Sequence, residues 1–239
     1  MMKLGLLDAV PPQYNEATGK TDSECFRELF ASVGATADMP DYRVSLGVFP
    51  QSLDECDAYL VTGSPCSVYD DLPWITELEN FVRQCHQAKK PLVGVCFGHQ
   101  LIAQALGGTV QNAEQGWLLG LYDFEVFQSK PWMTSTQTSY SLYFVNHDQV
   151  VELPPGAERL GQSPRCPNLM YTLDDHILCL QPHPEHPYPS VKIFTEELKP
   201  ILTPEVYEYA CTSFEAGTPD AALFGRWIWR FLTNDTNAS

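Results

Sequence analysis

One cysteine stands where an apolar run passes into a helical pattern, with a glycine two residues away on each side. Residues 91–108 read PLVGVCFGHQLIAQALGG, and Gly94 and Gly98 flank Cys96. This is the strand, sharp turn and helix of a nucleophile elbow, with cysteine in place of serine. A thiol at a helix N-terminus is favoured as the thiolate. We predict that Cys96 is a nucleophile and that the Phe97 N–H points to a developing oxyanion. The alternative is a buried structural thiol.

A cysteine nucleophile needs a general base, and the base needs an orienting group. His183 follows the apolar run at 177–180, within the sequence QPHPEHP, whose prolines restrict the backbone. Glu185 stands two residues later, so in an extended segment both side chains face the same side. We therefore predict that His183 is the base and that Glu185 orients its ring.

Other uses of the histidines compete with this interpretation. His147, in FVNHD, is the main rival as base, but its neighbour Asp148 should point to the opposite face of an extended segment. His183, Glu185 and His186 would together offer metal ligands, but their spacing matches no zinc helix. A zinc deaminase would also need a Pro-Cys-x-x-Cys, and none follows. We expect neither a metal nor another cofactor.

A third polar segment ends an earlier apolar run. Residues 59–74 read YLVTGSPCSVYDDLPW. Gly63 allows close approach of the backbone to a ligand, and Ser64 belongs to the same turn, at the sheet edge where parallel α/β folds bind ligands. One N–H of this turn is predicted to complete the oxyanion hole. The alternative is an ordinary β–α loop in which Asp70 and Asp71 are solvated.

Apolar patterns predict the elements that position these residues. Strand-like runs and helical patterns alternate over the first 106 residues, which is typical of parallel β-α-β units between two helical layers. From 109 to 180 short strands and turns dominate, which indicates an antiparallel meander on the same sheet. Strands are predicted at 4–7, 44–49, 59–61, 92–95, 126–127, 143–145 and 177–180, and helices at 22–33, 73–88, 188–198, 204–213 and 220–232. The prediction is an α/β fold with a mostly parallel central sheet flanked by helices. One domain should span 1–200, with a C-terminal helical extension at 201–239 packed on it.

The composition excludes several functions. The 239 residues include 30 Asp and Glu against 14 Lys and Arg, and the formal net charge of −16 repels phosphate backbones and anionic membranes. No apolar stretch reaches membrane-spanning length, and the start lacks the pattern of a signal peptide. Eight cysteines are spread along the chain without a C-x-x-C pair. We expect a cytoplasmic globular protein that binds neither nucleic acid nor membranes and acts on a small molecule.

Taken together, these motifs resemble the class I, or triad, glutamine amidotransferases. The elbow reads GVCFGHQ at 94–100, the downstream motif HPE at 183–185, and the oxyanion strand TGSPCSVYDD at 62–71, in the order of the family. The segment NHDQV at 146–150 is similar to the one that holds glutamine in the amidotransferase part of GMP synthetases. The similarity covers roughly residues 3–190.

The resemblance implies a flavodoxin-like class I amidotransferase fold and a set of residue roles. Cys96 would be the nucleophile, His183 the base and Glu185 its orienter, with the N–H groups of Gly63 and Phe97 as oxyanion hole. The implied substrate contacts are Ser64, Gln100, Asn146 and His147.

The implied reaction is hydrolysis of the glutamine side-chain amide through a γ-glutamyl thioester. Since no synthetase motifs follow, the ammonia would pass to a separate synthetase subunit or another acceptor. The alternative is a stand-alone γ-glutamyl peptidase or hydrolase that acts on glutathione-like isopeptides. A pocket extending past the leaving group would favour the peptidase, and an exposed apolar patch around the mouth would favour a partner. A catalytically silent binding domain is a third alternative, against which the intact triad argues.

Overall fold

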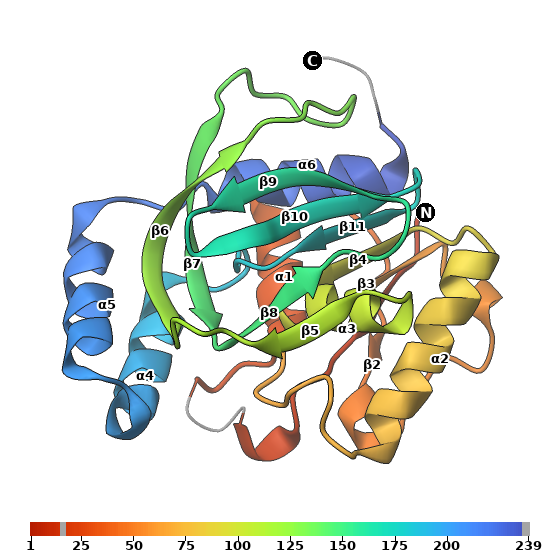
Figure 1. The fold of residues 1–239 in the computed structure, drawn as a ribbon. Coiled ribbons are helices and arrows are strands. Elements are labelled where there is room, and N and C mark those ends of the chain that lie inside the picture. Colours follow the sequence, from red (N-terminus) through yellow and green to blue (C-terminus); the bar gives the residue numbers. More distant parts are fainter. Residues whose placement is uncertain (15–17, 236–239) are drawn as a thin grey trace.

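A nine-stranded sheet forms the centre of the computed structural model, which describes residues 1–14 and 18–235 (Figure 1). The strand order is β2-β1-β3-β4-β11-β10-β9-β6-β7, and β5 and β8 form a separate antiparallel pair. The strands are β1 (Leu4–Leu7), β2 (Asp41–Tyr42), β3 (Ala58–Val61), β4 (Leu92–Val95), β5 (Thr109–Asn112), β6 (Leu118–Val126), β7 (Ser139–Asn146), β8 (Asp148–Glu152), β9 (Ala157–Ser163), β10 (Cys166–Leu173) and β11 (Ile177–Leu180).

The sheet has a parallel part and an antiparallel part. β2, β1, β3, β4 and β11 pair in parallel. β10, β9, β6 and β7 continue the sheet as an antiparallel meander. The predicted α/β fold, with a mostly parallel centre and an attached meander, is therefore confirmed.

Helices cover both faces of the parallel part (Figure 1). The helices are α1 (Asp22–Ser32), α2 (Pro73–Gln87), α3 (Phe97–Ala105), α4 (Tyr188–Leu198), α5 (Pro204–Ala216) and α6 (Ala221–Thr233). α1 and α6 pack together on one face, in a cluster that includes Phe30 and Trp227, and α2 and α3 pack together on the other. Alternate residues of the strands serve the two clusters, because successive side chains of a strand point to opposite faces.

The start of α1 is fixed by its own sequence. Thr21 is the N-cap, its hydroxyl accepts the Glu24 N–H, and the Glu24 carboxylate accepts the Thr21 N–H at 2.8 Å. The proline at the first position of α2 has the φ that a helix start needs. The capping box places Asp22 as the first residue of α1, where it reaches the cavity described below.

The prediction of a strand at 44–49 is wrong. Val44–Leu46 is a 3-10 helix that ends at Gly47 with a φ of +75°, and the strand in this region is β2. Val44 is buried, but Leu46 and Val48 are exposed. The apolar residues of this run therefore do not form one buried surface. Their hydropathy alone led to the wrong prediction of a strand. The strand predicted at 126–127 likewise ends at Val126, and Phe127 is exposed.

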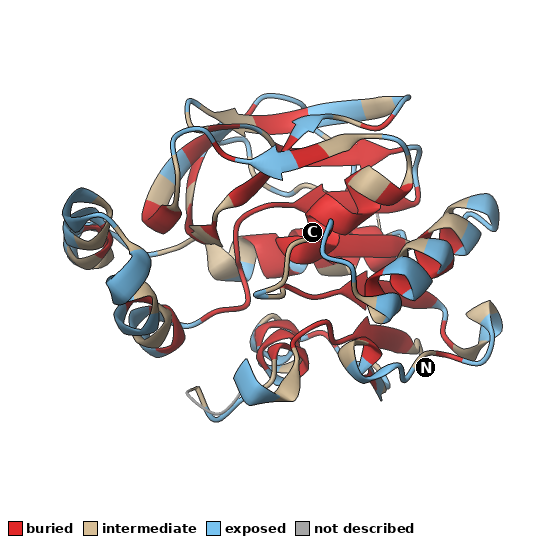
Figure 2. Cartoon of the chain, turned by 60° about the horizontal axis from the view of Figure 1, so that its bottom comes forward, coloured by how far each residue is buried: buried red, intermediate tan, exposed pale blue. Residues whose placement is uncertain are grey.

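The C-terminal helices contact different parts of the sheet. α5 packs on β6, α4 contacts β7 and α5, and α6 returns to pack on α1 and β4. Of the extension predicted at 201–239, α5 and α6 pack on elements of the region predicted as the main domain, and the last four residues lie outside the described residues. Figure 2 shows a buried centre, whereas α4 and α5 expose much of their surface. No helix among the described residues is long and apolar enough to cross a membrane.

Candidate active site

Cys96 occupies the turn between β4 and α3 in a backbone conformation that is rare for a side-chain-bearing residue. Its φ is +50° and its ψ is −104°. A Cβ on Gly94 would lie 2.5 Å from the Gly98 carbonyl oxygen, and a Cβ on Gly98 would lie 2.3 Å from the Val61 carbonyl oxygen. The glycines are therefore needed because the turn, the helix and β3 touch through their backbones.

Gly63 follows β3 and lies between three groups that are far apart in the sequence. A Cβ at this position would meet Asp22 Oδ2 and His183 Cε1 at 3.2 Å each, and the Cβ of Cys96 at 3.8 Å. Phe97 is the first residue of α3, so its N–H has no acceptor within the helix. The parallel strand order thus brings the predicted nucleophile, base and oxyanion residues to one place.

His183 and Glu185 form a buried pair directly after β11. Their side chains are 4% and 0% exposed, and Nδ1 of His183 lies 2.6 Å from Oε1 of Glu185. The His183 N–H donates to the Tyr143 carbonyl oxygen at 2.8 Å, which fixes the segment against β7. The i and i+2 geometry predicted for this pair is therefore present.

The pKa values of the pair are set by their mutual charges. Burial lowers the pKa of His183, but the charges of Glu185 and Cys96 outweigh it and hold this pKa well above its usual value. Burial raises the pKa of Glu185, and the charges of His183 and His186 reverse this, so the net pKa is lowered. The arrangement favours an imidazolium next to a carboxylate.

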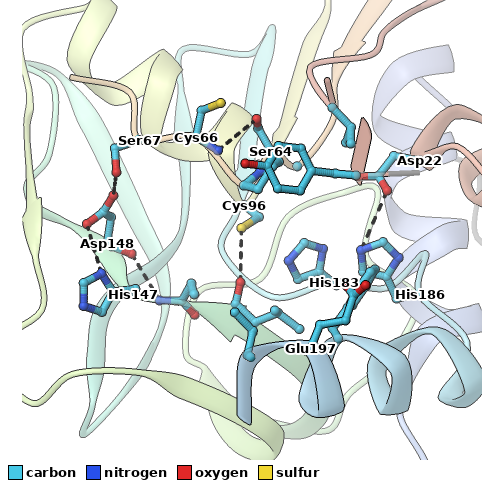
Figure 3. A pocket seen from close by; sticks show the side chains of 18 of the residues that line it. Asp22, Ser64, Cys66, Ser67, Cys96, His147, Asp148, His183, His186 and Glu197 are labelled. Carbon is cyan, nitrogen blue, oxygen red and sulfur yellow. Dashed lines mark hydrogen bonds and ion pairs between the residues drawn. The ribbon is translucent and has the colours of Figure 1, made fainter. Parts of the chain in front are cut away.

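The sulfur of Cys96 is hydrogen-bonded away from the base in this structure. Sγ donates to the Val145 carbonyl oxygen at 3.8 Å (Figure 3). His183 Nε2 is buried and has no hydrogen-bond partner among the described residues. This nitrogen is therefore free to exchange a proton with the sulfur or with a ligand.

A cavity of about 530 Å³ opens over Cys96. Of the residues predicted from the sequence, Phe97 and Glu185 lie behind the wall, and the others line the cavity: Gly63, Ser64, Cys96, Gln100, Asn146, His147 and His183. Figure 3 shows the labelled side chains on two sides of Cys96, with Ser67, His147 and Asp148 on one side and Asp22, His183, His186 and Glu197 on the other.

On the first side, hydrogen bonds tie the turn between β7 and β8 to its surroundings. Asp148 accepts from the Ser67 hydroxyl at 2.5 Å and from the Tyr69 hydroxyl at 2.8 Å. Gln100 Nε2 donates to the Asp148 carbonyl oxygen at 2.9 Å, and Asn146 Nδ2 donates to the same oxygen at 3.1 Å. The buried Asn146 Oδ1 has no partner among the described residues.

The expectation that Asp148 points away from His147 is wrong. Oδ1 of Asp148 lies 3.9 Å from Nδ1 of His147, and both residues line the cavity. The reason is the turn between β7 and β8, which interrupts the alternation of an extended strand. His147 is 40% exposed and stacks on Trp117, with ring centroids 5.0 Å apart, whereas His183 is buried beside Gly63.

The second side contains Asp22 and Glu197, which the sequence did not single out, and His186, which it offered only as a possible metal ligand. His186 stacks on His183, and its Nε2 lies 3.6 Å from Glu185 Oε1 and 3.9 Å from Asp22 Oδ1. Burial lowers the pKa of His186 to about 4. Burial, together with the Glu185 charge, raises the pKa of Asp22 to about 7. His186 follows the HPE motif, but no sequence signal connects Asp22 or Glu197 with it.

Among the described residues, two clusters place side-chain atoms that could bind a metal within 4.8 Å of one another: His183, Glu185 and His186, and His86, Asp174 and His176. In both clusters the imidazole rings stack, with interplanar angles of 26° and 18°. Ring-nitrogen lone pairs lie in the ring plane, so stacked rings do not direct them to one point. The Oε1 atom of Glu185 is already hydrogen-bonded to His183. We interpret both clusters as paired histidines rather than cation sites.

A model of the glutamine amidotransferase class-I family matches residues 29–190. The chain belongs to the class-I glutamine amidotransferase family. Within it, γ-glutamyl peptidase 3 of Arabidopsis thaliana is 28% identical, over 91% of this chain and 90% of the relative. A subunit of the glutamine-hydrolysing GMP synthase of Sulfolobus acidocaldarius is 28% identical, over 71% of this chain and 87% of the relative.

Solved structures agree with the fold of this amidotransferase-family chain. A glutamine amidotransferase from Thermotoga maritima superposes with a TM-score of 0.76, over 97% of this chain and 98% of that one, at 17% identity. At this level of identity the likeness concerns the fold. The class I amidotransferase fold implied by the sequence is therefore confirmed.

Proposed function

We propose that this protein is a cysteine hydrolase that cleaves the γ-glutamyl amide bond of compounds whose leaving amine is larger than ammonia. The observation that carries the proposal is the extent of the cavity. It continues past Cys96 and His183 to Phe194, Leu198 and Ile201 along and beyond α4. Its volume of about 530 Å³ lies within the roughly 300–1,000 Å³ of pockets that enclose drug-sized ligands.

The first step forms a thioester. The Cys96 thiolate attacks the γ-carbonyl carbon, and the carbonyl oxygen becomes an oxyanion held by the N–H groups of Gly63 and Phe97. The carbon–nitrogen bond then breaks, and the His183 imidazolium gives its proton to the leaving amine. Glu185 keeps the ring oriented and stabilises its charged form, which the 2.6 Å contact supports.

The second step releases glutamate. His183, now neutral, takes a proton from a water molecule that attacks the thioester carbonyl. The carbon–sulfur bond breaks, the sulfur leaves as thiolate, and the proton remains on His183. The products are glutamate and the free amine, and Cys96 and His183 return to their starting states.

The side of the cavity around the turn between β7 and β8 suits the γ-glutamyl head. The unpartnered Oδ1 of Asn146 is an acceptor for the α-ammonium group, and the half-exposed His147 and the Ser64 hydroxyl are polar contacts for the rest of the head. Both hydrogen bonds of Gln100 Nε2 go to protein groups, so we assign Gln100 to holding this turn in place.

Hydrolysis of glutamine itself, with ammonia passed to a separate synthetase subunit, is the second candidate. The feature that favours it is the apolar rim of the cavity, where Tyr14 and Ile201 are 52% and 65% exposed. An exposed apolar rim is typical of a surface that docks a partner. The relative named as a GMP synthase subunit supports the same candidate.

Glutamate release from L-glutamine and from γ-glutamyl amides of larger amines separates the two candidates. We expect kcat/KM for the larger amides to exceed that for glutamine, and Cys96→Ala to lower all of these rates by at least about 10⁴-fold. The melting temperature of Cys96→Ala should match that of the wild type and serves as the folding control.

Two results would contradict the proposal. Hydrolysis that survives Cys96→Ala would remove the assigned nucleophile. Glutamine turnover that exceeds that of every larger amide would instead support the ammonia-producing subunit.

A further inference from the structure

His186 is buried directly beside the proposed base, but the proposed reaction does not use it. It is 5% exposed, and its ring stacks on the His183 ring, with centroids 4.6 Å apart and an interplanar angle of 26° (Figure 3). Phe194 of α4 contacts the His186 ring edge-on, with centroids 5.0 Å apart and an angle of 69°. The three rings form a continuous row, so the base touches α4 through His186.

The His186 ring presents an uncharged face to His183. Its Nε2 lies 3.6 Å from Oε1 of Glu185, and a ring nitrogen beside a carboxylate is favoured in its N–H form. The other ring nitrogen, Nδ1, is buried without a hydrogen-bond partner among the described residues. Burial lowers the pKa of His186 to about 4, so the ring carries one proton and no charge near neutral pH. His186 therefore stacks on His183 without adding a second cation.

Two contacts of different kinds fix the His183 ring. The 2.6 Å contact between Nδ1 and Glu185 Oε1 fixes one atom of the ring and leaves the ring able to tilt about that atom. A flat contact over the ring face restricts this tilt, because it fixes the plane of the ring. Nε2, the atom that exchanges protons in the proposed reaction, lies across the ring from Nδ1. A tilt would therefore move Nε2 away from its reaction partners.

The stack matters more in the second step of the proposed reaction than in the first. In the first step His183 is an imidazolium, and the negative charges of Cys96 and Glu185 both act on it. These two attractions align the ring. In the thioester, Cys96 is uncharged and His183 is neutral, since it has given its proton to the leaving amine. The hydrogen bond to Glu185 is then weaker because one of its charges is lost, and the stack on His186 becomes the main restraint on the ring plane.

We infer that His186 is a positioning residue that holds the ring of His183 in place for hydrolysis of the thioester. The inference rests on the proposed two-step reaction and gives a role in its second step to a residue outside the proposed Cys-His-Glu triad. In this role His186 exchanges no proton and acts only through His183.

The two steps can be measured separately with p-nitrophenyl acetate. This small ester acetylates a reactive thiol without γ-glutamyl recognition, and nitrophenolate leaves without a proton from His183. The burst of nitrophenolate measures acetylation, and loss of the acetyl group from the isolated acetyl-enzyme, followed by mass spectrometry, measures hydrolysis. Cys96→Ala supplies the background from the other cysteines. We expect His186→Ala to slow hydrolysis by about tenfold or more and to change the burst rate by less than about threefold.

Two further variants separate the stack from general packing. His186→Phe keeps a flat ring over His183 and should restore hydrolysis to within about threefold of the wild-type rate. His176→Ala is the matched control, because the buried His176 stacks on His86 at the opposite end of β11, with centroids 5.2 Å apart and an angle of 18°. The control should lower the melting temperature but leave both rates unchanged.

The outcomes separate the positioning role from the proposed function. Unchanged hydrolysis in His186→Ala, equal slowing of both steps, or a folded His186→Phe as slow as His186→Ala would overturn the positioning role. Cleavage of γ-glutamyl amides, measured by glutamate release, would stand in each case. A wild type that forms and hydrolyses the acetyl thioester but cleaves no γ-glutamyl amide would contradict the proposed function alone. An equal burst from Cys96→Ala and wild type would overturn both.

Discussion

The strand ends around Cys96 and the cavity wall formed by α1 and α4 are held in different ways. Around Cys96 the backbones of β3, β4 and α3 touch through glycines, and His183 and Glu185 are a buried pair with opposite charges. Along the wall, α4 exposes much of its surface, and Glu197 has no partner among the described residues (Figure 2). One region is fixed by packing, and the other is available to a ligand.

The difference shows what each region is suited to do. Groups that exchange protons and form covalent bonds must keep their relative positions. The close backbone contact of β3, β4 and α3 around Cys96, called the junction below, holds them in place. A wall of exposed side chains on a helix at the edge of the sheet can change without disturbing that junction. We therefore expect substitutions at the junction to affect rate and stability together, and substitutions in the wall to affect substrate choice.

The largest expected effect comes from breaking the buried pair. Glu185→Gln should lower kcat/KM by about 10³- to 10⁴-fold, because His183 loses the carboxylate that orients its ring and stabilises its charge. Since Glu185 raises the pKa of His183, the variant should lose the imidazolium at lower pH. The alkaline limb of the pH–rate profile should move to lower pH, and an unmoved limb would exclude Glu185 as the orienting group.

The next largest effect is expected from a steric clash between α3 and β3 at the junction. Gly98→Ala places a Cβ 2.3 Å from the Val61 carbonyl oxygen and should lower the free energy of unfolding by about 3 kcal/mol, or prevent folding. Gly34→Ala is the matched control, since this glycine has a φ of +78° but open space around it. The control should cost about 1 kcal/mol in urea denaturation. Equal losses in both variants would show that β3 and α3 are not in contact at this point.

Another effect is expected from Asp22, the buried acid of the wall. The pKa of Asp22 is about 7 in the folded protein against an ordinary value near 3.8, so the folded state binds this proton more tightly than the unfolded state. Stability should therefore fall as pH rises from about 4 to about 7, by about 4 kcal/mol for this group. Asp22→Asn should remove this part of the pH dependence in denaturation curves. An equal or steeper fall in the variant would contradict the assignment.

The smallest effect concerns the strained turn itself. Cys96→Gly should be more stable than Cys96→Ala by about 1 kcal/mol, because glycine adopts a φ of +50° without the crowding of a Cβ. Both variants lack the thiol and should be inactive. Equal melting temperatures would mean that the turn is not strained in the wild type.

Local patterns account for much of the fold. The capping box at Thr21 and the proline at the first position of α2 specify helix starts within a few residues. β1, β4, β11 and α4 have the predicted bounds. The run at 44–49 could not be assigned correctly, because whether Leu46 and Val48 are buried depends on what packs over them.

The sequence by itself determined the nucleophile, base and orienter proposed for this protein, because each belongs to a short motif whose spacing constrains the local backbone. Only the tertiary structure decided that Asp148 turns toward His147 and that Asp22 and Glu197 line the same side of the cavity as His183. These contacts join α1, α4 and the ends of β7 and β11. Their proximity arises from strand order and helix packing, which no local pattern encodes.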